Sequence, residues 1–405
     1  MAEKYKLTEV GKIPSVWEVK SLNDISKITR LAGYEYSSMW QEDEKGEIIA
    51  LRGFNIGQNK IIEKDFVRIS NKLSLKLSRS RLFKRNVIYP CVGTIGNAAV
   101  IEEDDKYHIQ QNIAKISPDE EKIDAYYLAH YLMSSFGLNE IFKFNGTSSQ
   151  PNILVGSLRQ YSIVVPPLKE QTAIATALSD ADNYINSLEK LIAKKQLIKQ
   201  GAMQKLLTPK ADWVVKKLGE VADLKNGFAF KSINYDGKGE FLIITIANVQ
   251  GGYMDTNECN RIVSLPKQIQ SHQKLVKEDL LISMTGNVGR VCKVNIENAL
   301  LNQRVGKIIP LNIDSDFLFH LLNSKSFLEE MILSAQGGAQ GNISKNDILG
   351  FETSIPKDKT EQTRIATILS DMDADIAATE KQLAKARSIK QGMMQQLLTG
   401  KIRLI

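Results

Sequence analysis

The 405-residue sequence has few of the residues that build metal centres and disulfide frameworks. It contains three cysteines, Cys91, Cys259 and Cys292, and four histidines, and no cysteine lies within five residues of another. This spacing argues against a structural zinc site and against a disulfide scaffold. We therefore expect no metal ion and a reducing compartment.

Long apolar runs are also missing. No stretch approaches the roughly 18 uncharged apolar residues that a transmembrane helix requires, and the N-terminus MAEKYKLTEV lacks the apolar segment of a secretion signal. We therefore expect a cytoplasmic protein with no membrane partner. The formal charge of +7, from 53 Lys and Arg against 46 Asp and Glu, favours a polyanionic partner only modestly.

The usual catalytic motifs are absent as well. The sequence has no G-x-x-x-x-G-K-[ST] phosphate loop, and the glycines of residues 337–341 lack the strand–turn–helix context of a dinucleotide site. The Pro166 and Pro167 pair lacks the neighbouring asparagine and aromatic residue of an amino-methyltransferase loop. We expect no catalytic residue and no cofactor bound by the chain itself.

The dominant feature is an internal repeat. Residues 170–210 align without a gap over residues 361–401, and 25 of the 41 positions are identical. Fainter similarity extends upstream, where Trp17 aligns with Trp213 and residues 93–96 align with 286–289. The chain is therefore two tandem copies of a unit of about 190 residues. The similar segments are either a duplicated packing element or two equivalent docking surfaces for two copies of one partner.

Apolar residues in both similar segments recur at alternating intervals of four and three, which is typical of a coiled-coil seam. The seam comprises Ile174, Leu178, Ile185, Leu188 and Ile192 in the first copy and Ile365, Leu369, Met372, Ile376 and Leu383 in the second. A helix over residues 170–207 would be about 57 Å long. Antiparallel pairing would place two globular units at opposite ends, whereas the alternative is that each helix packs only on its own domain. Gly201 and Gly392, late in each helix, predict a bend or a close approach.

The segments before each helix have a mixed α/β pattern. Short apolar runs predict strands at residues 47–51, 87–89, 98–101, 162–165, 241–246 and 279–283, and amphipathic patterns predict helices at 125–133 and 316–323. The predicted fold class is α/β, with two globular domains separated by two long antiparallel helices in a pseudo-twofold repeat. The expected domains are residues 1–168 and 209–359, and the expected helical regions are 169–208 and 360–405.

Three motifs together resemble the specificity subunit of type I restriction-modification systems. They are the opening GKIPSVWEVKSL at 11–22, the PPLKEQ helix entry at 166–171 and the ending KQGMMQQLLTGK at 390–401. The resemblance implies two target recognition domains, each reading one half of a split site in double-stranded DNA. It also implies that the helices set the spacing and dock two methyltransferase subunits, which motor-nuclease subunits join. S-adenosylmethionine, ATP and Mg would then belong to the partners, and the chain itself would not be an enzyme.

Polar loops between the predicted strands supply the candidate base-reading residues, because Asn, Gln and Arg side chains match the edges of adenine and guanine. The candidates for one half-site are Arg52, Asn55, Thr94, Asn97, Gln110, Gln111 and Gln150. Those for the other are Thr285, Asn287, Asn302, Gln303, Arg304, Gln336 and Gln340. Ordinary turns are the alternative interpretation of any single one. For the whole chain, the alternatives are a repeat scaffold without DNA reading and a free-standing methyltransferase.

Overall fold

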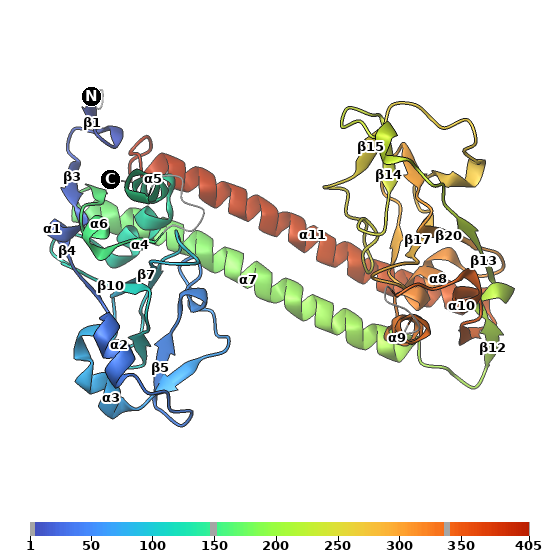
Figure 1. Cartoon of the computed structure of the whole chain (residues 1–405), viewed down its shortest axis with the longest axis horizontal. Helices are drawn as coiled ribbons and strands as arrows, with labels where there is room; N and C mark the ends of the chain where they lie inside the picture. The colour runs from blue at the N-terminus through green and yellow to red at the C-terminus, as the bar shows by residue number, and fades with distance from the viewer. Residues whose placement is uncertain (1–4, 146–151, 336–340, 405) are drawn as a thin grey trace. The chain divides into compact units, whose positions relative to one another are not determined.

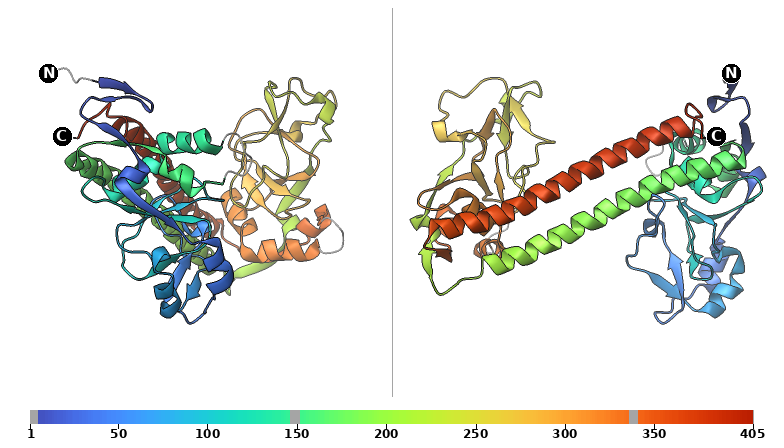
Figure 2. Two further views of the ribbon diagram at one scale, coloured as in Figure 1. Left: turned by 60° about the vertical axis from the view of Figure 1, so that its left-hand side comes forward. Right: turned by 180° about the vertical axis from the view of Figure 1, so that it is seen from behind.

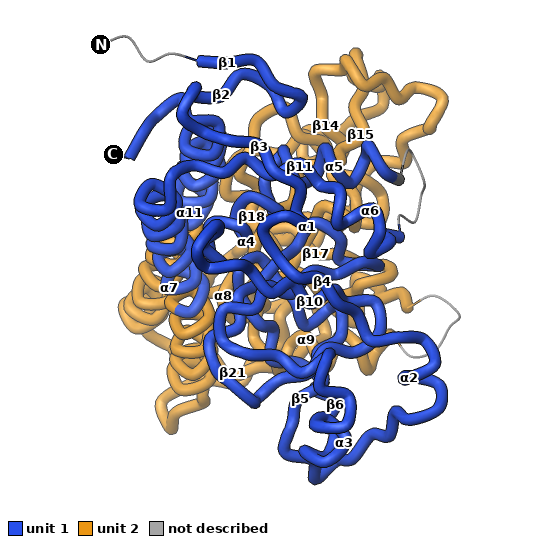
Figure 3. The backbone as a smooth tube through the Cα atoms, turned by 90° about the vertical axis from the view of Figure 1, so that its left-hand side faces the viewer, with its two compact units in different colours: residues 1–190, 381–405 blue, residues 191–380 orange. Residues whose placement is uncertain are grey.

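The computed structural model describes residues 5–145, 152–335 and 341–404. Its contacts group the chain into two units (Figure 3). Unit 1 comprises residues 1–190 and 381–405, and unit 2 comprises residues 191–380. Each unit therefore holds one of the divergent segments together with part of each repeated helix. The sequence-based boundaries kept the helices separate from the globular domains, whereas the structure divides each helix between the two units.

Unit 1 is built around a four-stranded antiparallel sheet with the order β4-β10-β7-β8. Its strands are β4 (Ser26–Arg30), β10 (Ile113–Pro118), β7 (Val87–Pro90) and β8 (Ala99–Val100). A second sheet, β6-β5-β9, contains the parallel pair β5 and β9. Its strands are β6 (Val67–Ile69), β5 (Ile48–Leu51) and β9 (Tyr107–Ile109). Two ribbons complete the strands: β1 (Tyr5–Thr8) with β2 (Gly11–Pro14), and β3 (Glu18–Ser21) with β11 (Ser162–Val165).

The short helices of unit 1 are α1 (Leu22–Ile25), α2 (Gly33–Met39), α3 (Asn71–Lys76), α4 (Ala125–Met133), α5 (Ser135–Asn145) and α6 (Val155–Arg159). Two 3-10 turns, η1 (Gly53–Asn55) and η2 (Ser78–Ser80), lie in its loops. Helix α4 begins where predicted because the carboxylate of Asp124 accepts bonds from the first free backbone N–H groups, those of Tyr126 and Tyr127.

Unit 2 repeats the main sheet and one ribbon of unit 1, and its second sheet has a fourth strand. Its main sheet has the order β13-β20-β17-β18, with β13 (Ala222–Asn226), β20 (Val305–Pro310), β17 (Leu280–Ser283) and β18 (Val291–Lys293). The second sheet has the order β15-β14-β19-β16, with β15 (Asn260–Ile262), β14 (Phe241–Ile244), β19 (Ala299–Leu301) and β16 (Lys274–Leu275). The ribbon of β12 (Trp213–Lys217) with β21 (Glu352–Pro356) matches β3 with β11. The helical segments are α8 (Ser315–Leu322), α9 (Lys325–Ser334), α10 (Lys345–Leu349), η3 (Leu218–Glu220), η4 (Ser232–Asn234) and η5 (Ser271–Gln273).

Two unbroken helices of 39 residues carry the most similar sequence, α7 (Leu168–Leu206) and α11 (Lys359–Leu397) (Figures 1 and 2). In unit 1, Lys390 pairs with Asp182 and Arg387 with Glu189, so residue numbers rise in α7 as they fall in α11. In unit 2, Lys195 pairs with Asp375 at 2.7 Å and Lys199 pairs with Asp373, which again shows antiparallel helices.

This arrangement decides between the two packing schemes for the helices. The end of α11 lies in unit 1, so the alternative that each helix packs only on its own domain is wrong. All the predicted seam residues are buried except Met372, which is half-buried. Antiparallel pairing is therefore confirmed within each unit. The placement of the two globular domains at opposite ends of the helices stays a prediction.

The helix ends are part of the two main cores. In unit 1, Ile174 and Leu178 of α7 and Leu397 of α11 belong to one cluster of buried residues with Trp17 and Tyr127. In unit 2, Ile365 and Leu369 of α11 belong to the equivalent cluster. Burying each large apolar side chain contributes about 1.5–3 kcal/mol, so the helix ends are held chiefly by the domain cores.

The two helix glycines differ from the prediction. Neither Gly201 nor Gly392 interrupts its helix, and a Cβ atom added at either position would meet nothing within 4 Å. The close approach predicted for them is therefore absent within the described residues.

Candidate nucleic-acid interface

In unit 1 the predicted reading residues meet where β5, β7 and β9 end. Arg52 follows β5, Thr94 and Asn97 lie in the loop after β7, and Gln110 and Gln111 follow β9. Backbone and side-chain bonds join these loops. The Thr94 hydroxyl donates to the Gly53 carbonyl at 2.7 Å, Asn97 donates to the Ile56 carbonyl at 3.0 Å, and the Gln110 N–H donates to the Leu51 carbonyl at 3.0 Å. We call Arg52, Thr94, Asn97, Gln110 and Gln111 the unit 1 edge.

The side chains of the unit 1 edge differ in accessibility. Thr94 and Gln111 are exposed, Arg52 and Asn97 are half-buried, and Gln110 is buried. The Arg52 guanidinium lies 4.5 Å from the centre of the Phe54 ring and donates to the Asp65 carbonyl. Because Phe54 is 42% exposed, this cation–π pair offers a planar surface to a ligand. Base reading by these residues stays a prediction.

Asn55 has a structural role instead. Its side chain is fully buried, accepts from the Arg52 N–H at 3.0 Å and donates to the Lys64 carbonyl at 2.7 Å. Its repeat equivalent, Asn248, is also buried and makes the same pattern of bonds to the Thr245 N–H and the Asp255 carbonyl. Both amides bond to the backbone of their own loops, so their hydrogen-bonding groups are not available to a base. The structure therefore does not support the predicted reading role of Asn55.

Unit 2 gathers its predicted residues in the same way. Thr285 and Asn287 follow β17, and Asn302, Gln303 and Arg304 follow β19. The Met284 N–H donates to the Arg304 carbonyl at 3.0 Å, which joins the two loops. Asn287, Gln303 and Arg304 are exposed, while Thr285 and Asn302 are half-buried. We call these five residues the unit 2 edge. Three other predicted residues, Gln150, Gln336 and Gln340, lie outside the described residues.

A pair of glycine turns shapes the two edges. Gly93 and Gly96 have φ of 82° and 90°, and Gly286 and Gly289 have φ of 72° and 77°. A Cβ atom at Gly96 would lie 2.9 Å from a Leu138 methyl, and one at Gly289 would lie 2.7 Å from the Met331 Cβ. Glycine is therefore required by both the backbone conformation and the close packing on α5 and α9. The turn is a frame common to both edges, and the variable side chains project from it.

Cys91, Cys292, His130 and His320 are buried side chains with structural surroundings. No group of three or more metal-ligating side chains occurs among the described residues. Burial raises the pKa of the Cys91 thiol to about 11 and that of the Cys292 thiol to about 12, so neither is a ready nucleophile. His130 and His320 are buried, and each has a serine partner on a long helix, Ser179 at 3.2 Å and Ser370 at 3.0 Å. Among the described helices, none has the length and apolar character needed to cross a membrane.

The comparisons with known proteins agree with this geometry. The family described as the type I restriction modification DNA specificity domain matches the chain twice, over residues 14–200 and 210–387. The type I restriction enzyme MjaVIII specificity subunit of Methanocaldococcus jannaschii is 28% identical, over 99% of this chain and 96% of its own length. The type I restriction enzyme EcoKI specificity subunit of Escherichia coli is 24% identical, over 97% and 90% of the two chains.

Solved structures show the same fold. The S subunit of a type I restriction-modification system from M. genitalium aligns with a TM-score of 0.61 and 16% identity, covering 98% of this chain and 99% of that one. A second match is a chain from a structural study of complex assembly and conformational transition in the type I R-M system. It aligns with a TM-score of 0.57 and 18% identity. That match covers 96% of this chain and 99% of the other.

Proposed function

The chain belongs to the type I restriction-modification DNA specificity family, and we propose that its two units read the two halves of one bipartite site in double-stranded DNA. The observation that carries this proposal is a duplicated frame with different side chains. The glycine turns of both edges have matching conformations, whereas Gln110 and Gln111 of the unit 1 edge align with Asn302 and Gln303 in unit 2. One frame presenting two sets of hydrogen-bonding groups is suited to two different base sequences.

The long helices would dock two copies of a methyltransferase subunit. Their sequence similarity extends to positions that internal packing does not explain. Ile198 and Ile389 are repeat equivalents, and their exposed fractions are 51% and 52%. The adjacent Gly201 and Gly392 face open space. An exposed apolar residue beside a glycine, present in both copies, supports two equivalent docking surfaces for one kind of partner.

The chain itself would have no catalytic role. S-adenosylmethionine would be bound by the methyltransferase subunits, and ATP and Mg by motor-nuclease subunits that join the complex. The contribution of this chain would be to select the site and to fix the distance between the two methylated adenines through its paired helices.

The proposal is tested by producing the chain with its methyltransferase subunit in a methylation-free bacterial host and mapping methylated adenines by single-molecule sequencing. The expected result is one bipartite motif with a spacer of fixed length. DNA binding by the complex should weaken steeply as salt rises, because phosphate contacts release counterions. A complex that assembles but neither binds nor methylates DNA would overturn the proposal in favour of a scaffold.

A further inference from the structure

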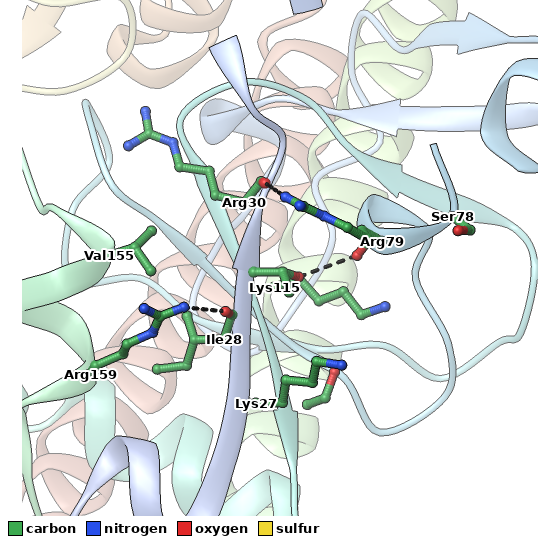
Figure 4. Close-up of a pocket in the computed structure, with 10 residues that line it drawn as sticks. Lys27, Ile28, Arg30, Ser78, Arg79, Lys115, Val155 and Arg159 are labelled. Carbon is green, nitrogen blue, oxygen red and sulfur yellow. Dashed lines mark hydrogen bonds between the residues drawn. The ribbon is translucent and has the colours of Figure 1, made fainter. Parts of the chain in front are cut away.

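A basic pocket of about 620 Å³ lies beside the edge strand β4 of unit 1 (Figure 4). Five basic residues line it, and its lining contains no carboxylate. In Figure 4 the Arg30 and Arg159 guanidinium groups lie on one side of β4, and the Lys27 and Lys115 ammonium groups lie on the other. Lys27 and Arg30 come from β4, Arg79 from the η2 turn, Lys115 from β10 and Arg159 from α6. The fold therefore places basic residues that are up to 132 residues apart in the sequence (159 − 27) around one edge strand.

No ion pair of the described residues neutralises these five charges. Arg79 donates to the Arg30 carbonyl at 3.5 Å, Arg159 to the Ile28 carbonyl at 3.4 Å and Lys115 to the Arg81 carbonyl at 2.5 Å. Lys115 is buried, and burial together with the charge of Lys27 lowers the pKa of its ammonium group. A bound anion would relieve this repulsion.

In unit 2, the position equivalent to Lys27 carries a carboxylate that forms ion pairs with two lysines. Lys27 pairs across the sheet with Ser117, which precedes Pro118 at the end of β10. Asp223 pairs with Ile309, which precedes Pro310 at the end of β20. Strand register therefore makes Asp223 the equivalent of Lys27. The Asp223 carboxylate forms ion pairs with Lys225 at 2.8 Å and with Lys345 at 2.7 Å. A carboxylate thus occupies the place where unit 1 has a cation.

A second substitution completes the contrast. Lys307 is the register equivalent of Lys115, and it forms an ion pair of 2.6 Å with Asp279. Asn86 stands in unit 1 where unit 2 has Asp279, since each residue directly precedes its strand. Asn86 accepts from the Phe83 N–H and Asp279 from the Val276 N–H, each three residues earlier. The local turn is the same in both units, and only the charge differs.

The position of the pocket identifies the anion. The Arg30 guanidinium bonds to the side chain of Asn112, which directly follows Gln110 and Gln111 of the unit 1 edge. A DNA duplex whose bases meet that edge carries phosphates on both strands next to the bases that are read. The pocket therefore adjoins the proposed reading residues and presents charge of the sign that the DNA backbone requires.

We propose that this basic pocket binds backbone phosphates flanking the half-site read by unit 1, and that the described residues of unit 2 form no equivalent clamp. The proposal rests on the proposed function of the edges. It makes the two half-sites unequal, because unit 1 would hold its half largely through charge. Unit 2 would depend more on its base contacts and would tolerate high salt better.

The test is the double variant Lys27→Asp and Asn86→Asp, which gives unit 1 the two carboxylates that unit 2 has at the equivalent positions. The variant is measured in complex with the methyltransferase subunit. Affinity for a duplex carrying the mapped site is measured between 50 and 400 mM salt. Each lost phosphate contact should reduce the slope of log K against log salt by about 0.9 and weaken binding about eightfold at 0.1 M salt. Arg159→Ala, at an exposed side chain, should reduce the slope by one contact.

Two controls separate the pocket from general electrostatics. Lys325→Asp on α9 removes an exposed cation that forms an ion pair with Glu329 at 3.6 Å, and it should leave the slope nearly unchanged. Asp223→Asn releases Lys225 and Lys345, and it should steepen the slope. The pocket variants should weaken cognate and noncognate duplexes equally, because phosphates carry no sequence information.

The outcomes distinguish this inference from the proposed function. Wild-type binding that is specific, with pocket variants that keep the wild-type slope, would overturn the clamp and leave the function intact. Absence of specific binding by the wild-type complex would overturn both. Calorimetry of the full chain with pyrophosphate covers the other source of phosphate. Binding that pocket variants abolish but that does not compete with DNA would reassign the pocket to a free anion and overturn the clamp.

Discussion

Glu170 and Arg403, which are 233 residues apart in the sequence, form a two-point ion pair in unit 1. The Arg403 Nε lies 2.5 Å from one carboxylate oxygen and its Nη2 lies 2.7 Å from the other. The Trp17 indole N–H donates to the same carboxylate at 2.9 Å. Glu170 is 2% exposed and the Arg403 side chain 11%, so the C-terminal residues are fixed to the start of α7 by a buried charge pair.

Arg403→Ala should destabilise unit 1 by about 3 kcal/mol, because it leaves the carboxylate of Glu170 buried without its main charged partner. Urea unfolding followed by circular dichroism measures the loss. The repeat supplies a matched control, since Glu361 is the equivalent of Glu170 and pairs with the half-exposed Lys210 at 2.8 Å. Lys210→Ala should lower stability by less than about 1 kcal/mol. Equal losses in the two variants would contradict this account.

The two buried histidines make stability depend on pH. Burial, with the charge of Lys390, lowers the pKa of His130 to about 3, and burial, with the charge of Lys199, lowers that of His320 to about 4. Both stay neutral in the folded chain while the unfolded chain takes up protons below its ordinary pKa of 6.5. Stability is therefore lost as the pH falls from about 6.5 toward 4.

His130→Gln and His320→Gln should each reduce this acid sensitivity. At pH 5, protonation of one histidine stabilises the unfolded chain by about 2 kcal/mol relative to pH 8. Between pH 8 and pH 5, the free energy of unfolding of each variant should therefore fall by about 2 kcal/mol less than that of the wild type. The free energy of unfolding at pH 8.0 and 5.0 gives the comparison. Variants that show the wild-type dependence on pH would refute the role assigned to the histidines.

Gly201→Ala and Gly392→Ala should each stabilise the free chain by about 0.5–1 kcal/mol, because alanine favours a helix and its methyl group would meet nothing within 4 Å. Ala193→Gly, at an exposed position of α7, is the reverse control and should destabilise by a similar amount. If the glycines serve the proposed docking surface, the same alanine variants should bind fewer methyltransferase subunits, as measured by native mass spectrometry.

Changes at one edge should affect one half of the recognised site. Gln303→Ala with Arg304→Ala should relax specificity for the half-site read by unit 2, with about 1–3 kcal/mol lost for each base contact, and leave the other half unaltered. Gln111→Ala should do the reverse. The methylated motif of each variant is the readout. Loss of specificity at both halves from a single edge would refute independent reading.

Regular elements and their duplication were predictable from the sequence. The helix predicted at 125–133 is α4, and the strand predicted at 162–165 is β11. The seam spacing predicted both long helices, because apolar periodicity depends on local sequence alone. The predicted region 169–208 matches α7 to within two residues, whereas α11 ends at Leu397, eight residues before the end of the predicted region 360–405. The division of each helix between the two units depends on contacts between segments almost 200 residues apart. Local sequence patterns do not predict such contacts.

The candidate sites show where sequence reasoning reaches its limit. Asn55 has the composition expected of a reader, but it is buried under its own loop. A signal existed, because Asn248 is the same residue at the same place in a copy whose loops otherwise differ, and such identity indicates a structural role. Lys27, Arg79 and Arg159 were missed because each looks like an ordinary surface cation. Strand register shows that Asp223 takes the place of Lys27 in the repeat, and the pocket places Arg79 and Arg159 beside Lys27.

The assignment of residues 381–405 to unit 1 has a consequence during synthesis. Unit 2 is one continuous stretch of chain, so all of it is synthesised before residues 381–405. Unit 1 begins first, but it lacks Leu397 of its core and Arg403, the partner of Glu170, until the residues after unit 2 have been made. The N-terminal domain is thus the last to be completed, and a nascent chain truncated before residue 381 would leave its apolar face open to chaperones.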